Sequence, residues 1–411
     1  MERFTIGDAA ELAGDVGPDP RLIAVLAELD GTVDTGELRA IVADRAAGLP
    51  LLTHRLVRHD GTRATRWQQV AIDPAEHVLE IATDDPVGTA TDVLVASLPE
   101  TIPMWRLWVL RSCGTCHLLF VAHHVLLDGV TALTVVSALF GSPPQPPTAA
   151  PAPRRAWLAP LAALNVPTSA TSLLAPLTSG FRLVTVEEDL ERLRGIAHRA
   201  GATINDVLLL AVAEALRAAA LQRGERLRRV VVSVPVTIGA ADGEPSRNRV
   251  GGFLVSVPQR RRGETDTQLL GRLAARTRRR KWLARAPSGS TALSATLVAL
   301  GRTGWYRPLF EHQRAIISLV TNLRGPAAAL TVMGARVRSL TPISPTLGNV
   351  GVVVAALSYA GRLRITARLD RAAWDVEDTF VDALRSGLSG STAETGTPGS
   401  AGDADTTEPS G

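Results

Sequence analysis

Apolar and polar positions along the chain follow patterns that predict strands and helices in alternation. Short apolar or alternating runs are typical of β-strands, and apolar positions three and four residues apart are typical of helices. We expect a short helix at 20–29 and a longer one at 35–50, ended by Gly48 and Pro50. Strands are expected at 51–59 and 65–72, around a turn at Asp60-Gly61, and at 104–112 and 117–124, with a helix from Gly129 to Phe140.

The second half shows the same alternation. Thr203 to Asp206 fits a capping box, with Asp206 in the place of the usual Glu or Gln, so a helix is expected to begin there and to continue to 220. A basic helix is expected at 267–285 and a closing helix at 374–388. The expected strands lie at 181–188, 228–238, 250–258, 314–326, 348–361 and 361–370, and a further helix lies at 190–201.

A stretch rich in Pro and Ala separates the two halves, and this composition favours an extended linker. We therefore expect an N-terminal subdomain at 1–142, a crossover linker at 143–178 and a C-terminal subdomain at 179–388. Residues 389–411 are small and polar, and we expect them to be disordered. A length of 411 residues also exceeds one ordinary core. The alternation predicts an α/β fold with two layered halves facing each other across a cleft.

Composition and charge narrow the class of protein. The net charge of +4 is too small for a nucleic-acid-binding protein, and no recognition helix or RNA-binding motif occurs. The N-terminus lacks the pattern of a signal peptide, and two cysteines in this length are typical of a reducing compartment. The most apolar window, 118–141, contains His123, His124 and Asp128, which make a membrane span costly. We expect a cytoplasmic protein without a transmembrane segment.

The stretch RSCGTCHLLFVAHHVLLDG (111–129) holds both cysteines and three of the eight histidines. Its C-x-x-C-H pattern is that of covalent haem attachment, which needs export and a second axial ligand, so haem is not expected. A zinc site needs four ligands, but strand alternation places His117 and His123 on one face and His124 on the other. We expect no metal, and two free thiols at an exposed turn.

The remaining chemistry lies in HHVLLDG (123–129). A pair of core histidines is the simpler interpretation, but two adjacent histidines followed at this spacing by Asp-Gly favour a catalytic one. A histidine at a strand end facing a cleft titrates near the working pH and can take a proton from a hydroxyl. Asp128 is close enough in sequence to orient that ring, and Gly129 lets the turn into the next helix close without a clash.

HHVLLDG matches the HHxxxDG motif, so the chain resembles the acyltransferase superfamily with chloramphenicol acetyltransferase-like folds. Within that superfamily it is similar to the bacterial wax ester synthase/diacylglycerol acyltransferases. The similarity spans most of residues 50–370. The matching stretches, in the order that family shows, are WQQVAIDPAEHV (67–78), MWRLWVL (104–110), INDVLLLAVAEALR (204–217), RNRVGGFLVSVP (247–258), SLVTNLRGP (318–326) and SYAGRLRI (358–365).

The resemblance implies two chloramphenicol acetyltransferase-like subdomains, each a mixed sheet with helices, and a channel between them. His124 would be the general base on the acceptor hydroxyl, His123 a supporting residue and Asp128 mainly structural. An acyl-CoA would be the co-substrate and a long-chain alcohol or diacylglycerol the acceptor. The reaction would need no cofactor, no metal and no covalent enzyme intermediate.

Other motif positions carry over from the resemblance. Asn205 and Asp206 match the family's Asn-Asp pair and would shape the wall of the active site. Trp105, from a Pro-Met-Trp element, and Asn322 and Gly325, from TNLRGP, would line the channel, although Asn322 fits a structural turn equally well.

The chain departs from the family's pattern near its beginning. The opening Asp-x-x-Phe pattern is altered around Asp8, because Glu11 stands where the aromatic residue is expected. In TNLRGP, Thr321 takes the place of the family's serine. The departures towards the N-terminus bear on the substrate more than on the reaction type.

Two other functions stay open. A condensation-type acyltransferase of specialised metabolism would carry the same motif but use a carrier-protein donor or a non-lipid acceptor. A catalytically silent member would bind acyl thioesters without turnover. The Arg-rich runs 259–264 and 276–282 are either a solvated face or a dock for coenzyme A phosphates, an acyl carrier protein, or an anionic membrane or lipid-droplet surface.

Overall fold

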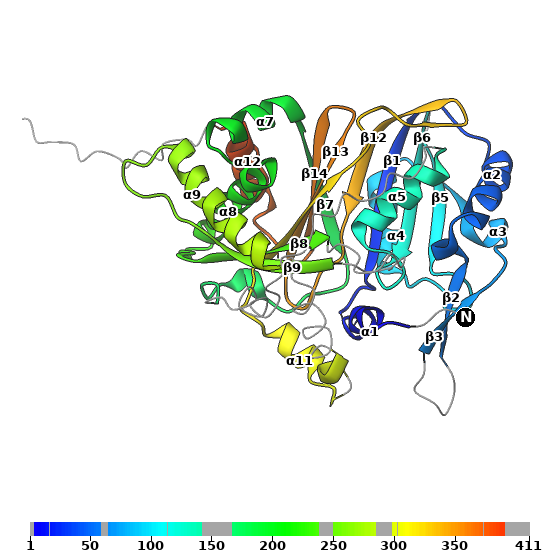
Figure 1. The fold of residues 1–411 in the computed structure, drawn as a ribbon, viewed down its shortest axis with the longest axis horizontal. Coiled ribbons are helices and arrows are strands. Elements are labelled where there is room, and N and C mark those ends of the chain that lie inside the picture. The colour runs from blue at the N-terminus through cyan, green and yellow to red at the C-terminus, as the bar shows by residue number, and fades with distance from the viewer. Residues whose placement is uncertain are drawn as a thin grey trace, which may run out of the picture.

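The computed structural model describes residues 4–15, 17–58, 65–112, 114–141, 167–237, 250–284, 298–301, 303–372 and 374–390. Most of the expected linker and nearly all of the expected disordered tail lie outside these residues. The described chain forms two six-stranded sheets and a two-stranded ribbon. Helices pack on each sheet, and the sheets meet in the middle of the molecule (Figure 1). There β12 (Ala335–Ile343) contacts β13 (Val352–Tyr359) and β14 (Arg362–Asp370).

The first sheet has the strand order β11-β12-β1-β6-β5-β4. Its central strands β1 and β6 are apolar along nearly their whole length, and both of their faces are buried. Each of these strands is paired with a neighbouring strand on both sides. β1 and β6 pair antiparallel, with Leu22 opposite His123. The histidine pair therefore lies at the end of the sheet where β6 finishes and β1 begins. The strands are β1 (Leu22–Asp30), β4 (Val78–Ala82), β5 (Trp105–Ser112), β6 (Thr115–His123), β11 (Thr331–Val332) and β12 (Ala335–Ile343).

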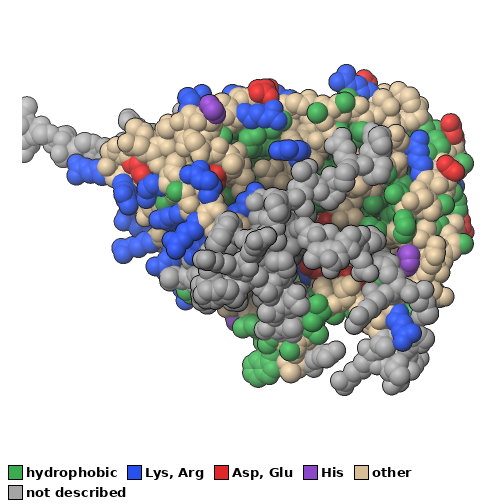
Figure 2. Space-filling model, viewed as in Figure 1, with side chains coloured by type: hydrophobic (Ala, Val, Ile, Leu, Met, Phe, Trp, Pro, Cys, Tyr) green, Lys and Arg blue, Asp and Glu red, His purple; other side chains and the backbone are tan. Residues whose placement is uncertain are grey.

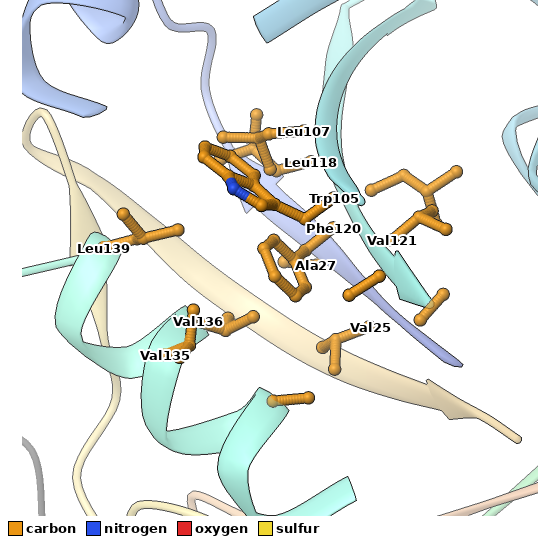
Figure 3. Close-up of a cluster of buried hydrophobic side chains, with 14 of the residues drawn as sticks. Val25, Ala27, Trp105, Leu107, Leu118, Phe120, Val121, Val135, Val136 and Leu139 are labelled. Atoms are coloured by element: carbon orange, nitrogen blue, oxygen red, sulfur yellow. The ribbon is translucent and has the colours of Figure 1, made fainter. Parts of the chain in front are cut away.

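The helix α5 (Gly129–Leu139) packs across the first sheet and closes its core. Figure 3 shows its side chains Val135 and Val136 turned toward Val25 of β1 and Phe120 of β6. The helix that carries the end of the HHVLLDG motif is therefore fixed by apolar packing. The other elements of this half are α1 (Ile6–Ala13), α2 (Thr35–Ala47), α3 (Pro74–His77), α4 (Pro86–Val95), the ribbon β2 (His54–Arg58) and β3 (Thr65–Gln69), and a 3-10 turn at Pro50–Thr53.

The second sheet has the strand order β7-β14-β13-β10-β8-β9. The helices α8 and α12 pack against each other so closely that a Cβ at Gly387 would lie 2.9 Å from the Cα of Ala211. The strands are β7 (Phe181–Asp189), β8 (Val230–Thr237), β9 (Val250–Val257), β10 (Ser318–Arg324), β13 (Val352–Tyr359) and β14 (Arg362–Asp370). The helices are α7 (Leu190–Arg199), α8 (Ile204–Gln222), α9 (Asp266–Ala284), α11 (Tyr306–Glu311) and α12 (Glu377–Ser389), with a 3-10 turn at Ser172–Leu174.

One strand departs from the division of the chain at its linker. β12 comes from the second half of the sequence but pairs antiparallel with β1 in the first sheet, with Leu340 opposite Ala27. The apolar β1 needs a partner on each edge, and the first half supplies only β6. The segment 331–343 therefore belongs to the first sheet and not to the C-terminal subdomain in which the sequence analysis placed it.

Several expected elements are confirmed and one is wrong. The helices expected at 35–50 and from Gly129 to Phe140 are present, as are the paired strands at 104–112 and 117–124. The helix expected at 20–29 is wrong, because these residues form β1. A run in which nearly every residue is apolar fits a buried strand as well as a buried helix, so the pattern alone does not decide.

The densest group of positive charge on the face shown in Figure 2 lies at one end of the molecule. Lys and Arg side chains gather over α9 and the loop before it (Figure 2). Across the described ranges, no helix is long and apolar enough to cross a membrane. The exposed basic residues of this surface are Arg260, Arg261, Arg262, Arg276, Arg278, Arg279 and Lys281.

Candidate active site

The histidine pair lies where β6 ends and the chain turns toward α5. The His123 N–H donates to the Met104 carbonyl at 2.9 Å, and the His124 N–H donates to the Arg21 carbonyl at 2.8 Å. The strand ends at His123, so the alternation that would send the two rings to opposite faces stops there. Both rings contact carboxylates from a single segment near the N-terminus.

That segment is α1 together with Asp15, the residue that follows the C-cap Gly14. Asp8, Glu11 and Asp15 are three and four residues apart, so they follow one face of the helix and its extension. Asp8 forms a capping box with Thr5 and accepts a hydrogen bond at 3.2 Å from the indole N–H of Trp67. α1 is thereby attached to β3, with Glu11 and Asp15 at the histidines.

His123 has both ring nitrogens engaged. Its Nδ1 accepts a hydrogen bond from the Val125 N–H at 3.1 Å, so the ring proton is on Nε2, which donates to Asp15 at 2.9 Å. Burial would raise the pKa of Asp15, but this hydrogen bond and the adjacent charges lower it on balance. Because neither nitrogen is available to a substrate, His123 is suited to hold the turn in place.

His124 has one ring nitrogen beside a carboxylate. Its Nδ1 lies 3.3 Å from Oε2 of Glu11, and the same oxygen lies 2.8 Å from Nη1 of Arg21. Among the described residues, its Nε2 has no hydrogen-bond partner. Burial lowers the pKa of His124, the charge of Glu11 opposes this shift, and the charge of Arg21 adds to it. The ring is therefore neutral near pH 7 and able to accept a proton.

Asp128 and Gly129 form the start of α5. The Asp128 carboxylate is the N-cap and accepts a hydrogen bond from the Thr131 N–H at 2.8 Å, which satisfies a donor at the beginning of the helix. Its negative charge also opposes the lowering of the pKa of His124. A Cβ at Gly129 would make only an ordinary contact with Leu323 at 3.5 Å, so the expected steric need for glycine is not found.

Trp105 lies in the hydrophobic core. Its side chain is fully buried, its indole N–H donates to the Leu52 carbonyl at 2.9 Å, and its ring stacks on His77. Figure 3 shows it beside Phe120 and Leu118 of β6. The position does not support the channel-lining role expected from the resemblance.

Asp206 is engaged in structural contacts at the start of α8. It forms the expected capping box with Thr203, and it accepts a buried hydrogen bond from the Thr277 hydroxyl of α9. Asn205 is half-buried in the first turn of the same helix. Asp206 thus joins two helices of the second half.

β10 brings the TNLRGP motif to the first half. Leu323 packs against the first core and reaches Gly129. Thr321 lies on the same face of the strand, and its Oγ1 is buried with no hydrogen-bond partner among the residues that the structure describes. Asn322 is exposed on the other face, and a Cβ at Gly325 would approach a backbone oxygen at 2.5 Å. Thr321, rather than Asn322, faces the first half.

The sequence analysis did not identify Asp15 or Arg21, and it noted Glu11 only as a departure from a family pattern. The spacing of acids along α1 was a usable signal, because it predicts one acidic helix face. Nothing in the sequence indicated that this face meets residues more than a hundred positions away.

The cysteine motif differs from its expected setting. Cys116 is completely buried on β6, not exposed at a turn, and burial raises the pKa of its thiol. Cys113 lies outside the described residues.

No group of His, Cys, Asp and Glu side chains suited to a metal ion occurs within the described part of the chain. A cavity of about 340 Å³ between α4 and β5 contains none of the expected site residues.

Known proteins are similar to this chain in sequence and in fold. Two family models match: the wax ester synthase/diacylglycerol acyltransferase catalytic domain over residues 22–160, and the WS/DGAT C-terminal domain over residues 247–390. A probable diacylglycerol O-acyltransferase of Mycobacterium tuberculosis is 27% identical, over 88% of this chain and 90% of its own. A second M. tuberculosis protein, a putative diacylglycerol O-acyltransferase, is 25% identical over 71% of this chain and 69% of its own.

Solved structures agree with the two-subdomain arrangement. The wax ester synthase/diacylglycerol acyltransferase from Marinobacter aquaeolei VT8 has a TM-score of 0.69 at 18% identity, covering 94% of this chain and 98% of that chain. The starter condensation domain of rhizomide synthetase, solved with C8-CoA, has a TM-score of 0.64 at 14% identity, covering 94% and 92%. The fold is thus α/β, with two chloramphenicol acetyltransferase-like subdomains. The two family matches and this fold together show that the chain belongs to the wax ester synthase/diacylglycerol acyltransferase family and is an O-acyltransferase.

Proposed function

We propose that this chain transfers an acyl group from a coenzyme A thioester to the hydroxyl of a long-chain alcohol or a diacylglycerol, with His124 as the general base. Nε2 of His124 takes the hydroxyl proton while the oxygen attacks the thioester carbon. A carbon–oxygen bond forms and the carbon–sulfur bond breaks. The departing thiolate recovers the proton from His124, which leaves an ester and free coenzyme A.

The environment of His124 is the observation that carries this proposal. The ring lies at the end of a rigid strand, its Nδ1 faces a carboxylate, and burial keeps it neutral near pH 7. A general base works best when its pKa lies near or below the working pH, because it must be unprotonated before the step. In this proposal His123 and Asp128 hold the turn, and Thr321 lines the wall from the second half.

The basic surface over α9 supports an anionic partner. Burial and the neighbouring charges of Arg272 and Arg261 lower the pKa of Arg276, as expected where like charges crowd. Coenzyme A phosphates, an acyl carrier protein and anionic lipid headgroups share the negative charge that such a surface attracts. Turnover measured with vesicles of phosphatidylglycerol and of phosphatidylcholine distinguishes a lipid surface from the soluble donors.

The test of the general base is thiol release from palmitoyl-CoA with hexadecanol or diacylglycerol as acceptor. We expect His124→Ala to lower kcat by about 100- to 10,000-fold, because the proton-transfer contribution is removed. His198→Ala, at an exposed position on α7, is the matched control and should keep the wild-type rate.

A wild-type rate in folded His124→Ala protein would contradict the assignment. Thiol release from an acyl carrier protein but not from palmitoyl-CoA, or only with a non-lipid acceptor, would favour the condensation-type alternative. Acyl-CoA binding without turnover by the wild-type chain would identify a silent member.

A further inference from the structure

Glu11 lies between the candidate base and a buried cation. Its Oε2 is 3.3 Å from Nδ1 of His124 and 2.8 Å from Nη1 of Arg21. The side chains of all three residues are less than a quarter exposed, at 24%, 18% and 14%. Nδ1 of His124 and Oε2 of Glu11 are both buried, and neither forms a well-aligned hydrogen bond with any described residue. The carboxylate oxygen thus contacts a cation on one side and the ring nitrogen on the other.

The position of Glu11 is fixed by contacts on both sides of α1. Asp8, one turn earlier, is held by Trp67 of β3. At the other end of the helix, a Cβ at Gly14 would lie 2.9 Å from the hydroxyl of Tyr306, and one at Gly301 would lie 2.8 Å from the Cβ of Ala13. α1 is thus packed against both halves of the molecule, which fixes the backbone that carries Glu11 beside the histidine.

Arg21 is also held in place by hydrogen bonds. Nη1 of Arg21 also donates to the Glu11 carbonyl at 3.2 Å, and the Arg21 N–H donates to Asp15 at 3.0 Å. Burial would raise the pKa of Glu11, but the charge of Arg21 and those of the two histidines lower it on balance. Glu11 is therefore an anion at neutral pH, shared between a permanent cation and a histidine.

We propose that Glu11 is a positioning residue for His124 and that Arg21 limits its effect. Glu11 accepts the Nδ1 proton of His124, which fixes the tautomer that presents the unprotonated Nε2 to the acceptor hydroxyl. When Nε2 takes the proton, the carboxylate stabilises the imidazolium. Arg21 shares the carboxylate oxygen and so keeps the ring from being protonated before the acceptor arrives. This inference rests on the proposed role of His124 as the base.

The family comparison does not cover these residues. The resemblance places an aromatic residue at position 11, and the match to the catalytic-domain model begins at residue 22, after Glu11, Asp15 and Arg21. The carboxylate and the guanidinium are therefore a pair that the family comparison does not assign.

The charges around His124 predict that two substitutions shift the pKa of its ring in opposite directions. Glu11 and Asp128 favour the protonated ring, whereas Arg21 and His123 disfavour it, and burial disfavours it most. Loss of the Glu11 charge therefore makes the ring harder to protonate, and loss of the Arg21 charge makes it easier. The other ionisable groups of this cluster are Asp15 and Tyr306, which face His123 and Arg21 respectively.

The test combines a pH profile with a direct titration. kcat/KM rises with pH as the base loses its proton, so Glu11→Gln should move that rise to lower pH and lower kcat by about 10- to 100-fold, with little change in KM. Arg21→Met should move the rise to higher pH. Glu37→Gln, at an exposed position on α2, is the matched control and should leave the profile unchanged.

NMR titration of the His124 ring in the resting protein measures the effect of Glu11 and Arg21 on its pKa directly, without turnover. We expect its pKa to fall in Glu11→Gln, to rise in Arg21→Met, and to take an intermediate value in the double variant, which leaves no unpaired buried charge. Shifts in the same direction for both single variants, or no shift, would overturn the inference. If the titration shifts as expected while His124→Ala still turns over, the coupling stands and the general-base proposal fails.

Discussion

At the residue scale, His77 shows what burial does to a histidine outside the active site. Its ring stacks on Trp105 with 4.2 Å between ring centroids, and its Nδ1–H donates to the Trp105 carbonyl at 2.8 Å. Burial lowers its pKa to about 4, although the hydrogen bond acts in the opposite direction. The unfolded chain, with an ordinary pKa near 6.5, binds this proton first as the pH falls. The free energy of unfolding therefore decreases from about pH 6.5 to pH 4, by up to about 3 kcal/mol.

We expect His77→Gln to flatten this pH dependence. The variant should lose about 1–2 kcal/mol of stability at pH 7, because the ring stacking is lost, and little more down to pH 4.5. Urea denaturation at several pH values measures both effects, with His198→Gln on the exposed face of α7 as the control. A variant whose stability falls with pH as steeply as the wild type would show that the dependence comes from other groups.

The residues of the active site were predictable from sequence only in part. His123, His124 and Asp128 stand in one short motif, whose spacing indicates a strand end followed by a helix N-cap. Asp15 meets His123 across 108 positions, and Glu11 meets His124 across a similar separation. Such contacts depend on where α1 packs in the folded chain, which local patterns do not encode.

At the element scale, signals at the ends of helices were more informative than apolar runs. Thr203 and Asp206 predicted the start of α8 through their capping box, because that motif satisfies particular backbone donors. The apolar run of β1 was misassigned to a helix, and β12 was not predicted at all. β1 is buried on both faces and does not show the alternation of a half-buried strand. β12 alternates only over Ala335 to Ser339 and is buried throughout from there to Ile343.

The same element carries a prediction about Asp206. We expect Asp206→Ala to destabilise the protein by about 2–3 kcal/mol, because α8 loses its cap and Thr277 of α9 loses a buried partner. Thermal or urea unfolding measures the change. Asn205→Ala, at the neighbouring half-buried position, should stay within about 0.5 kcal/mol of the wild type.

Activity separates the two roles considered for Asp206. If Asp206→Ala protein keeps its stability but loses turnover, the residue acts at the channel wall and not as a cap. The capping role predicts the reverse: the folded fraction turns over at the wild-type rate, and only the midpoint of unfolding changes.

At the scale of the whole molecule, a buried ion pair joins the N-terminal loop to the second sheet. Nη2 of Arg368 on β14 donates to Asp19 at 2.8 Å, and both side chains are at most 5% exposed. The guanidinium also lies 3.7 Å from the ring centroid of Phe181. The Ser179 hydroxyl and the Gly180 N–H donate to Asp19 as well. This loop leads directly into Arg21, so the pair connects the histidine site to the opposite half.

We expect Asp19→Ala to cost about 3–5 kcal/mol, because it leaves the Arg368 charge buried without its partner. Denaturant unfolding is the measurement. The matched control is Asp30→Ala, which removes the exposed pair with Arg338 and should change stability by less than about 1 kcal/mol.

A double variant isolates the charge from the packing. Asp19→Ala with Arg368→Met removes both charges, so it should be more stable than Asp19→Ala alone. If the double variant is the less stable of the two, the side-chain packing of Arg368 contributes more than its unpaired charge costs.

The strand exchange between the halves has a consequence for how the protein is made. β1 is synthesised early, but one of its edges stays open until β12, which ends at Ile343, has left the ribosome. An apolar strand with a free edge is a template for pairing with other chains. The first half therefore cannot complete its own sheet during synthesis, and a fragment cut at the linker would keep that edge exposed. We therefore expect the two halves to fold as a single unit, because each contributes a strand to the first sheet.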